Sequence, residues 1–130
     1  GGVPAPDLLN LAGRAIDGRI RQAAGDYQGA VAAFEEAVAI QDALPYLEPP
    51  YWYYPVRRSL GAALLQAGRP AEAEKAFQAA LEWFPNNAWS LYGLQKAQEG
   101  QNHNADAAKT EERLNRVLVG DVDGLELFRL

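Results

Sequence analysis

The chain has 130 residues, of which 48% are hydrophobic and 22% charged, with a formal net charge of −5 and no cysteine. This length suits a single domain with its own core, and the composition is far from that of disordered chains. The lack of cysteine excludes disulfides and thiolate metal sites, and an acidic chain without a lysine or arginine run is poorly suited to nucleic acid. No apolar stretch approaches the roughly 20 residues that a membrane span needs.

Amphipathic runs separated by glycine and proline predict six helices, at roughly 7–24, 27–43, 55–67, 70–83, 88–100 and 105–118. Helix starts are marked by candidate N-cap side chains and by prolines suited to a first turn: Asp7, Asp26, Asn87, Asn104, Pro55 and Pro70. The half-apolar tail, residues 120–130, is expected to be short and to lie back over the last helix pair.

The runs repeat along the chain. The stretch "AGDYQGAVAAFEEAVA" from Ala24 and the stretch "AGRPAEAEKAFQAALE" from Ala67 share glycine, alanine and phenylalanine in the same order, 43 residues apart. The matched residues are Gly25, Ala30, Phe34 and Ala37 in the first copy and Gly68, Ala73, Phe77 and Ala80 in the second. A weaker third copy follows at a spacing of 34, with Leu94, Ala107 and Leu114 after Leu60, Ala73 and Ala80.

A period of 34 residues with small residues at fixed points is the signature of tetratricopeptide repeats, and this chain resembles that family. The resemblance implies one all-α domain over residues 1–130, a right-handed superhelix of three helix-turn-helix repeats at about 11–44, 54–87 and 88–119. The spacing of 43 leaves an insert at 45–53 between the first two repeats. The sequence departs from the family pattern at Arg57, which replaces a tryptophan, at Asn102, which replaces a loop glycine, and at Glu111, which replaces a phenylalanine.

The insert lies within the stretch "YLEPPYWYYP" at 46–55, where prolines prevent a helix from continuing. With the following Pro-Val-Arg it is similar to the C-terminal part of large, mostly uncharacterised bacterial tetratricopeptide proteins. Two interpretations of its aromatic residues stay open. They either clasp neighbouring helices or line a pocket together with Trp89 and Tyr92.

In this family the first helix of each pair lines a concave groove. The resemblance implies that the groove-facing positions are Arg19, Arg58, Ala62, Leu65, Trp89, Tyr92 and Lys96. The predicted first helices carry six cations, whereas the second helices hold nine acidic and four basic residues. A cationic groove that selects carboxylates is one interpretation, and arginines paired with neighbouring acids at the surface is the other. The candidate partner-binding residues are Trp52, Tyr53, Arg57, Arg58, Trp89, Tyr92 and Lys96.

The sequence offers few candidate catalytic residues, and we expect neither an enzyme nor a cofactor. The single histidine, His103, lies in a loop, and one histidine cannot hold a metal alone. No glycine-rich phosphate loop or Ser-His-Asp set is present, and the Asp-x-Asp-Gly run at 121–124 lacks the later ligands of a calcium loop. Catalytic residues and metal ligands are therefore both predicted to be none.

The sequence favours a non-enzymatic protein-interaction module or scaffold that binds a partner peptide or helix, with acidic groups or a carboxylate, in its groove. One alternative is a pocket for a small molecule or lipid fragment beneath the insert. Another is a purely structural terminal segment of a longer solenoid, whose first helix stacks on an upstream repeat or on a second copy. Because the chain begins Gly1-Gly2 and contains no methionine, we expect it to be part of a longer protein. The compartment is left open by the sequence, with a soluble, cytoplasmic location slightly favoured.

Overall fold

The computed structural model describes the backbone of residues 5–44 and 55–128, and the side chains of residues 7–44 and 55–120. The described chain forms helices and no strands: α1 (Ala5–Ala23), α2 (Tyr27–Ala43), α3 (Val56–Gln66), α4 (Pro70–Trp83), α5 (Ala88–Gly100) and α6 (Asn104–Phe128). The predicted bounds of the first five helices agree with these to within two residues. The insert at 45–53, with Trp52 and Tyr53, lies outside the described residues.

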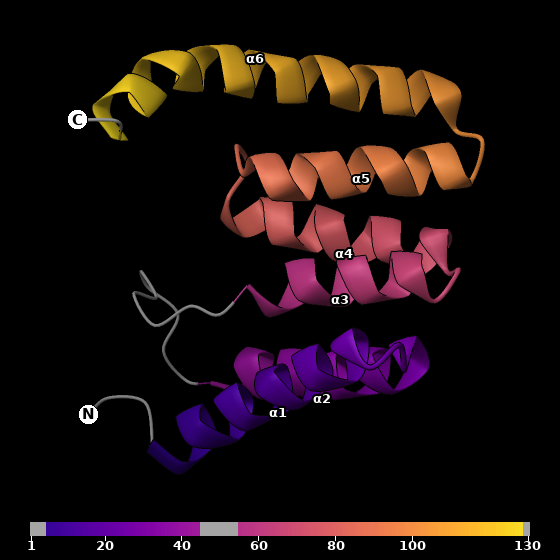
Figure 1. Cartoon of the computed structure of the whole chain (residues 1–130), viewed down its shortest axis with the longest axis vertical. Coiled ribbons are helices and arrows are strands. Elements are labelled where there is room, and N and C mark those ends of the chain that lie inside the picture. The colour runs from indigo at the N-terminus through magenta and orange to yellow at the C-terminus, as the bar shows by residue number, and fades with distance from the viewer. Residues whose placement is uncertain (1–4, 45–54, 129–130) are drawn as a thin grey trace.

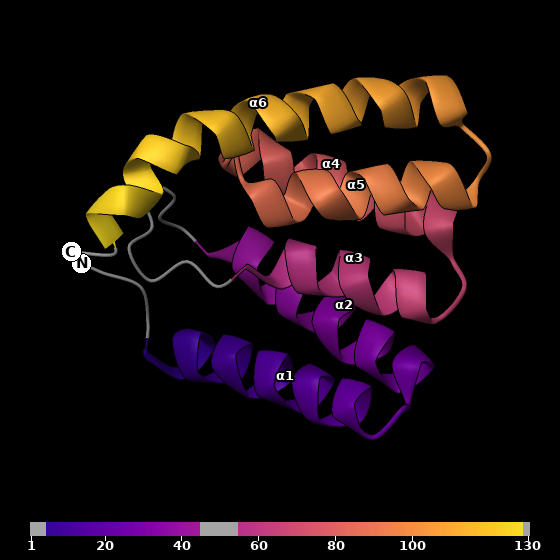
Figure 2. The same ribbon diagram turned by 45° about the horizontal axis from the view of Figure 1, so that its top comes forward.

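The helices form three hairpins, α1–α2, α3–α4 and α5–α6, stacked one on the next (Figure 1). Each helix packs against the one that follows it in the chain, and α3 also contacts α5. Figure 2 shows α3 and α5 on the same side of the stack, in front of α2 and α4. First helices therefore gather on one side and second helices on the other, which is the all-α superhelical repeat arrangement predicted from the sequence.

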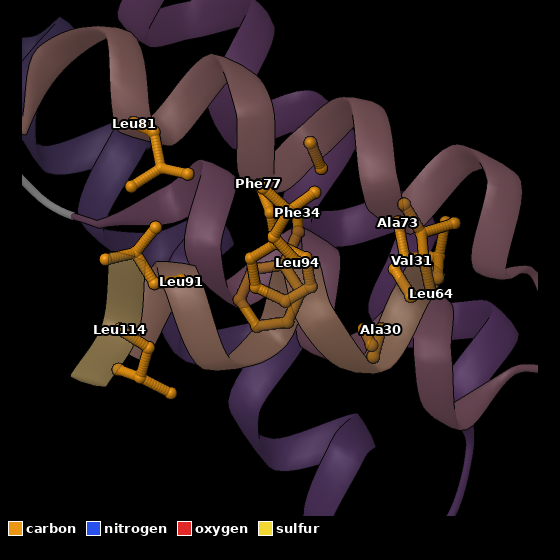
Figure 3. Packing of buried hydrophobic residues seen from close by; sticks show 13 residues of the cluster. Ala30, Val31, Phe34, Leu64, Ala73, Phe77, Leu81, Leu91, Leu94 and Leu114 are labelled. Atoms are coloured by element: carbon orange, nitrogen blue, oxygen red, sulfur yellow. The ribbon is translucent and has the colours of Figure 1, made fainter. Parts of the chain in front are cut away.

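The repeated phenylalanines hold the first two hairpins together. Phe34 and Phe77 are both buried in the main core cluster (Figure 3). A Cβ atom added at Gly18 would lie 2.6 Å from the Phe34 ring, and one added at Gly61 would lie 2.7 Å from the Phe77 ring. Since real Cβ atoms do not approach carbon this closely, only glycine lets the ring of the second helix reach the first helix.

Left-handed residues end the first helix of each hairpin in the same way. Gly25, Gly68 and Asn102 have φ values of +84°, +77° and +61°. Glycine adopts this conformation freely, and asparagine tolerates it better than most other side chains, so Asn102 can stand where the repeat calls for glycine. After each of them, a backbone amide closes the turn by donating to the carbonyl five residues earlier: Asp26 to Arg21, Arg69 to Leu64 and His103 to Gln98.

The prediction for the C-terminal tail, residues 120–130, is wrong. Helix α6 does not end near residue 118 with a segment folded back over the last pair; it continues to Phe128 and passes beyond the start of α5 (Figures 1 and 2). No proline occurs between 104 and 128, and a glycine such as Gly120 costs a helix only about 1 kcal/mol. The glycines therefore weaken this helix without ending it.

Candidate functional site

A groove of about 560 Å³ runs along the first helices, between α1, α3 and α5. It is lined by all seven positions that the resemblance assigns to the concave side: Arg19, Arg58, Ala62, Leu65, Trp89, Tyr92 and Lys96. Of the seven candidate binding residues, the structure thus brings four together here, namely Arg58, Trp89, Tyr92 and Lys96. Trp52 and Tyr53 lie outside the described residues, and their role stays a prediction.

The base of the groove is apolar. It is lined by Ala62 and Leu65 of α3 and by Phe77, whose ring extends from α4 past Gly93. A Cβ atom at Gly93 would lie 2.3 Å from that ring, so this glycine is what allows α5 to close over Phe77. The role of Gly93 was missed from the sequence because its counterpart one repeat earlier is Ser59, not glycine. The available signal was a glycine in the interior of a predicted helix.

Aromatic side chains form one wall of the groove. The side chain of Asn87 caps α5 by accepting a hydrogen bond from the Ser90 amide at 2.9 Å, which places Trp89 in the first helical turn. Trp89 is 72% exposed and Tyr92, one turn further along the same helix, is 50% exposed. Exposed aromatic side chains of this size offer a large apolar contact area.

Lys96 continues this wall. Its Nζ atom lies 5.2 Å from the centre of the Tyr92 ring and 3.2 Å from a carboxylate oxygen of Glu99. The hydrogen bond to Glu99 is the main cause that raises the pKa of Lys96 above its ordinary value. Lys96 is therefore charged at neutral pH, but part of its charge is already balanced within α5.

Two arginines bring positive charge to the groove without an internal partner. Arg19 on α1 and Arg58 on α3 have no ion pair or hydrogen bond among the described residues. Other arginines of this layer are paired: Arg14 lies 3.2 Å from Glu36, and Arg21 contacts both Asp17 and Asp26. Neutralisation by surface acids thus accounts for Arg14 and Arg21 and not for the two arginines that face the groove.

Arg57 lies elsewhere, although it is the neighbour of Arg58. Its side chain is only 13% exposed, contacts the carboxylate of Asp42, and donates a hydrogen bond of 3.3 Å to the Gln41 side chain. Successive residues of an α-helix point about 100° apart, and here this turn directs Arg57 toward α2 while Arg58 faces the groove. The structure therefore places Arg57 at the junction of α2 and α3.

Polar residues that the sequence analysis did not select complete the lining. The side chain of Gln22 on α1 donates a hydrogen bond to that of Gln66 on α3, and Ser59 lies beside Arg58. Gln22 and Gln66 follow Arg19 and Ala62 by three and four residues, one turn along the same helix faces. Extending the predicted groove stripe by one turn would have found them.

The described residues contain no group of three or more histidine, aspartate or glutamate side chains placed to hold a metal ion. His103 lies on the turn between α5 and α6, with its Nδ1 atom 3.9 Å from Glu74, and does not line the groove. No helix in the described part of the chain is both long and apolar enough to cross a membrane.

Comparison with known proteins identifies the repeats. Residues 64–121 match the sequence model of the tetratricopeptide repeat family. The solved structure of a mutant of the protein MamA is similar with a TM-score of 0.70 and 21% sequence identity, over 83% of this chain and 72% of that one. No curated protein matches the sequence.

Residues 64–121 therefore match tetratricopeptide repeats, as the spacing of the glycines, alanines and phenylalanines predicted, and the likeness to the solved structure confirms the fold. In general terms, such repeats support a protein-interaction scaffold. The narrower resemblance of the insert to large bacterial proteins stays a prediction.

Proposed function

We propose that the groove between α1, α3 and α5 binds a segment of a partner protein that presents at least one carboxylate. The observation that carries this proposal is the pair Arg19 and Arg58, which face an apolar groove without an ion-pair partner among the described residues. A carboxylate placed between them would complement their charge, and the exposed ring of Trp89 would supply apolar contact next to it. Arginine and tryptophan are the residues that most often dominate binding energy at such sites.

The open shape of the groove favours a polypeptide over a small molecule. Small-molecule sites bury roughly 70–90% of their ligand in a concave pocket. Trp89 and Tyr92 stand at least half exposed at the rim of this groove, so a compact ligand at its base would leave much of both rings in water. A peptide or helix that extends over the rim would cover them, and the rings then contribute to binding.

The proposed role is binding without the making or breaking of bonds. The only histidine of the chain, His103, lies away from the groove, on the turn that joins α5 and α6. The ionisable side chains that line the groove are Arg19, Arg58, Lys96 and Tyr92. Such a set suits recognition of an anionic group and provides no general base poised near neutral pH.

The test is a peptide-retention experiment with two charge-reversal variants. A labelled pool of acidic and neutral peptides is titrated against the wild type, Arg58→Glu and Arg116→Glu. Arg116 is exposed on α6 and lines none of the described hollows, so it is matched in charge change and differs in place. We expect Arg58→Glu to weaken retention of acidic peptides by about tenfold or more, the loss of one charge-assisted contact, and Arg116→Glu to leave it nearly unchanged. Equal retention by all three proteins would reject the proposal.

An architectural role is favoured by a separate observation. Leu9 and Ile20 are exposed apolar side chains on α1, 72% and 62% exposed. By the repeat spacings of 43 and 34, Ile20 corresponds to Ala63 of α3 and Ala97 of α5, and both alanines are 0% exposed. The face that other helices cover on α3 and α5 is therefore open on α1. We propose that it stacks on a helix of another repeat, supplied upstream or by a second copy.

A further inference from the structure

A smaller hollow adjoins the groove. It has a volume of about 200 Å³ and lies between α1 and the first turn of α3, with walls from Ala12, Ala15, Ile16 and Val56. Arg19 and Ser59 line both this hollow and the main groove. The two spaces are thus neighbours joined at Arg19, and we call the smaller one the α1–α3 pocket.

The walls of the α1–α3 pocket are aliphatic and fixed. Val56 and Ala15 are buried members of the second core cluster, and their positions are set by packing against Leu11 and its neighbours. Ile16 stands at the exposed rim. Apart from Arg19 at the junction, no charged side chain among the described residues lines the pocket. Its chemistry therefore suits an apolar group and disfavours a buried charge.

The size of the pocket indicates a side chain, not a whole ligand. Pockets for small molecules usually span roughly 300–1,000 Å³, and this one is smaller. A valine, leucine or isoleucine side chain fits the aliphatic walls, and its transfer from water would be driven by the apolar area removed. The occupant must also connect to whatever fills the main groove, because the two spaces meet at Arg19.

We propose that the partner segment carries an aliphatic residue in the α1–α3 pocket and, within about three residues along the chain, an aspartate or glutamate held by Arg19 and Arg58. The inference rests on the function proposed for the main groove and deepens it by naming the partner chemistry. The short separation follows from the shared position of Arg19, since an extended chain advances only about 3.3 Å per residue. Acidic segments that lack the aliphatic residue would bind more weakly.

The probe is a synthetic peptide set of three kinds. The first carries leucine and glutamate separated by zero to three residues, the second replaces leucine with alanine, and the third replaces glutamate with glutamine. Affinities are measured by fluorescence anisotropy. For the wild type we expect the leucine–glutamate peptides to bind about tenfold or more tightly than the alanine–glutamate peptides, which is the effect of burying one aliphatic side chain.

A pocket-filling variant separates this inference from the proposed function. Ala12→Leu places methyl groups in the α1–α3 pocket, and the same substitution at Ala32, exposed on α2, is the matched control. Ala12→Leu should abolish the preference for leucine over alanine and keep the preference for glutamate over glutamine, whereas Ala32→Leu should keep both. Circular dichroism and thermal melting establish that both variants fold. Ile16→Ala, at the exposed rim, is a second variant that should lower the leucine preference several-fold with little risk to folding.

The outcomes are distinct. Glutamate-dependent binding without a leucine preference, or a preference that survives both Ala12→Leu and Ile16→Ala, overturns this inference and leaves the proposed function standing. If glutamate and glutamine peptides bind alike and Arg58→Glu changes nothing, the proposed function fails and this inference fails with it. A leucine preference that disappears in Ala12→Leu, falls in Ile16→Ala and is kept in Ala32→Leu, together with dependence on glutamate, supports the inference.

Discussion

Substitution of Gly93 by alanine tests the packing that closes the base of the groove. The added Cβ atom would lie 2.3, 2.4 and 2.8 Å from three atoms at the tip of the Phe77 ring. Phe77 is 2% exposed, and the same end of its ring already lies against Gly61 of α3. Because the ring tip is held between α3 and α5, it cannot turn away from one helix without meeting the other.

The net effect is the difference between two terms. Overpacking of a core costs about 1–3 kcal/mol, and overlap this close favours the upper half of that range. Replacing glycine by alanine inside a helix returns up to about 1 kcal/mol. We therefore expect Gly93→Ala to lower the free energy of unfolding by about 1–2 kcal/mol, which corresponds to a fall of roughly 3–10 °C in Tm.

Thermal and urea unfolding followed by circular dichroism measure this change. Gly13→Ala is the matched control, since Gly13 lies inside α1 and a Cβ atom there would meet nothing within 4 Å. This control should gain stability by up to about 1 kcal/mol. A Gly93→Ala protein that melts at or above the wild type, beside a stabilised Gly13→Ala, would refute the steric argument.

Two further predictions concern α1 and α2. Asp26 accepts a hydrogen bond from the Gly29 amide at 3.0 Å and pairs with Arg21, and these contacts, the Gly29 bond first, hold the pKa of its carboxyl below the ordinary value. The ionised Asp26 carboxylate therefore contributes its full stabilisation above the unfolded pKa of about 4 and loses it as pH falls through the folded pKa. Below pH 4, Tm should fall less steeply in Asp26→Asn than in the wild type. Parallel curves of Tm against pH would contradict this. The second prediction concerns the exposed apolar side chains Leu9 and Ile20 of α1. Light scattering over a concentration series should show a mass that rises with concentration in the wild type and stays constant in a Leu9→Lys, Ile20→Lys double variant. A wild-type mass that never rises would exclude stacking on a second copy.

Most of the fold could be predicted because its signals are local. Asp26 and Asn87 cap the helices that they were expected to cap, and Pro70 stands at the start of α4. Glycines and phenylalanines at fixed spacings predicted the hairpins, since a ring on one helix needs a small residue on the other. The same spacing carried the groove-facing set from the family to this chain, and those positions do line one groove.

The features that escaped prediction depend on contacts between segments. The true end of α6 could not be read from residues 118–128, because glycine there lowers helix stability without forcing an end. Gly93 contacts a ring 16 residues earlier in the chain, and neither of its repeat counterparts is glycine. The α1–α3 pocket brings Ile16 and Val56 to one space, although 40 residues separate them.

Arg57 and Arg58 show how the repeat sorts identical side chains into different roles. Arg57 stands where the family usually has a tryptophan, and this partly buried cation is compensated by Asp42 and Gln41 of the preceding repeat. Its charge serves to join the first repeat to the second. Arg58, one residue later, faces the groove and has no ion-pair partner among the described residues. Since Lys96 is paired with Glu99, the proposed attraction of the groove for a carboxylate rests on Arg58 of α3 and Arg19 of α1, and Arg58→Glu reverses one of these two charges.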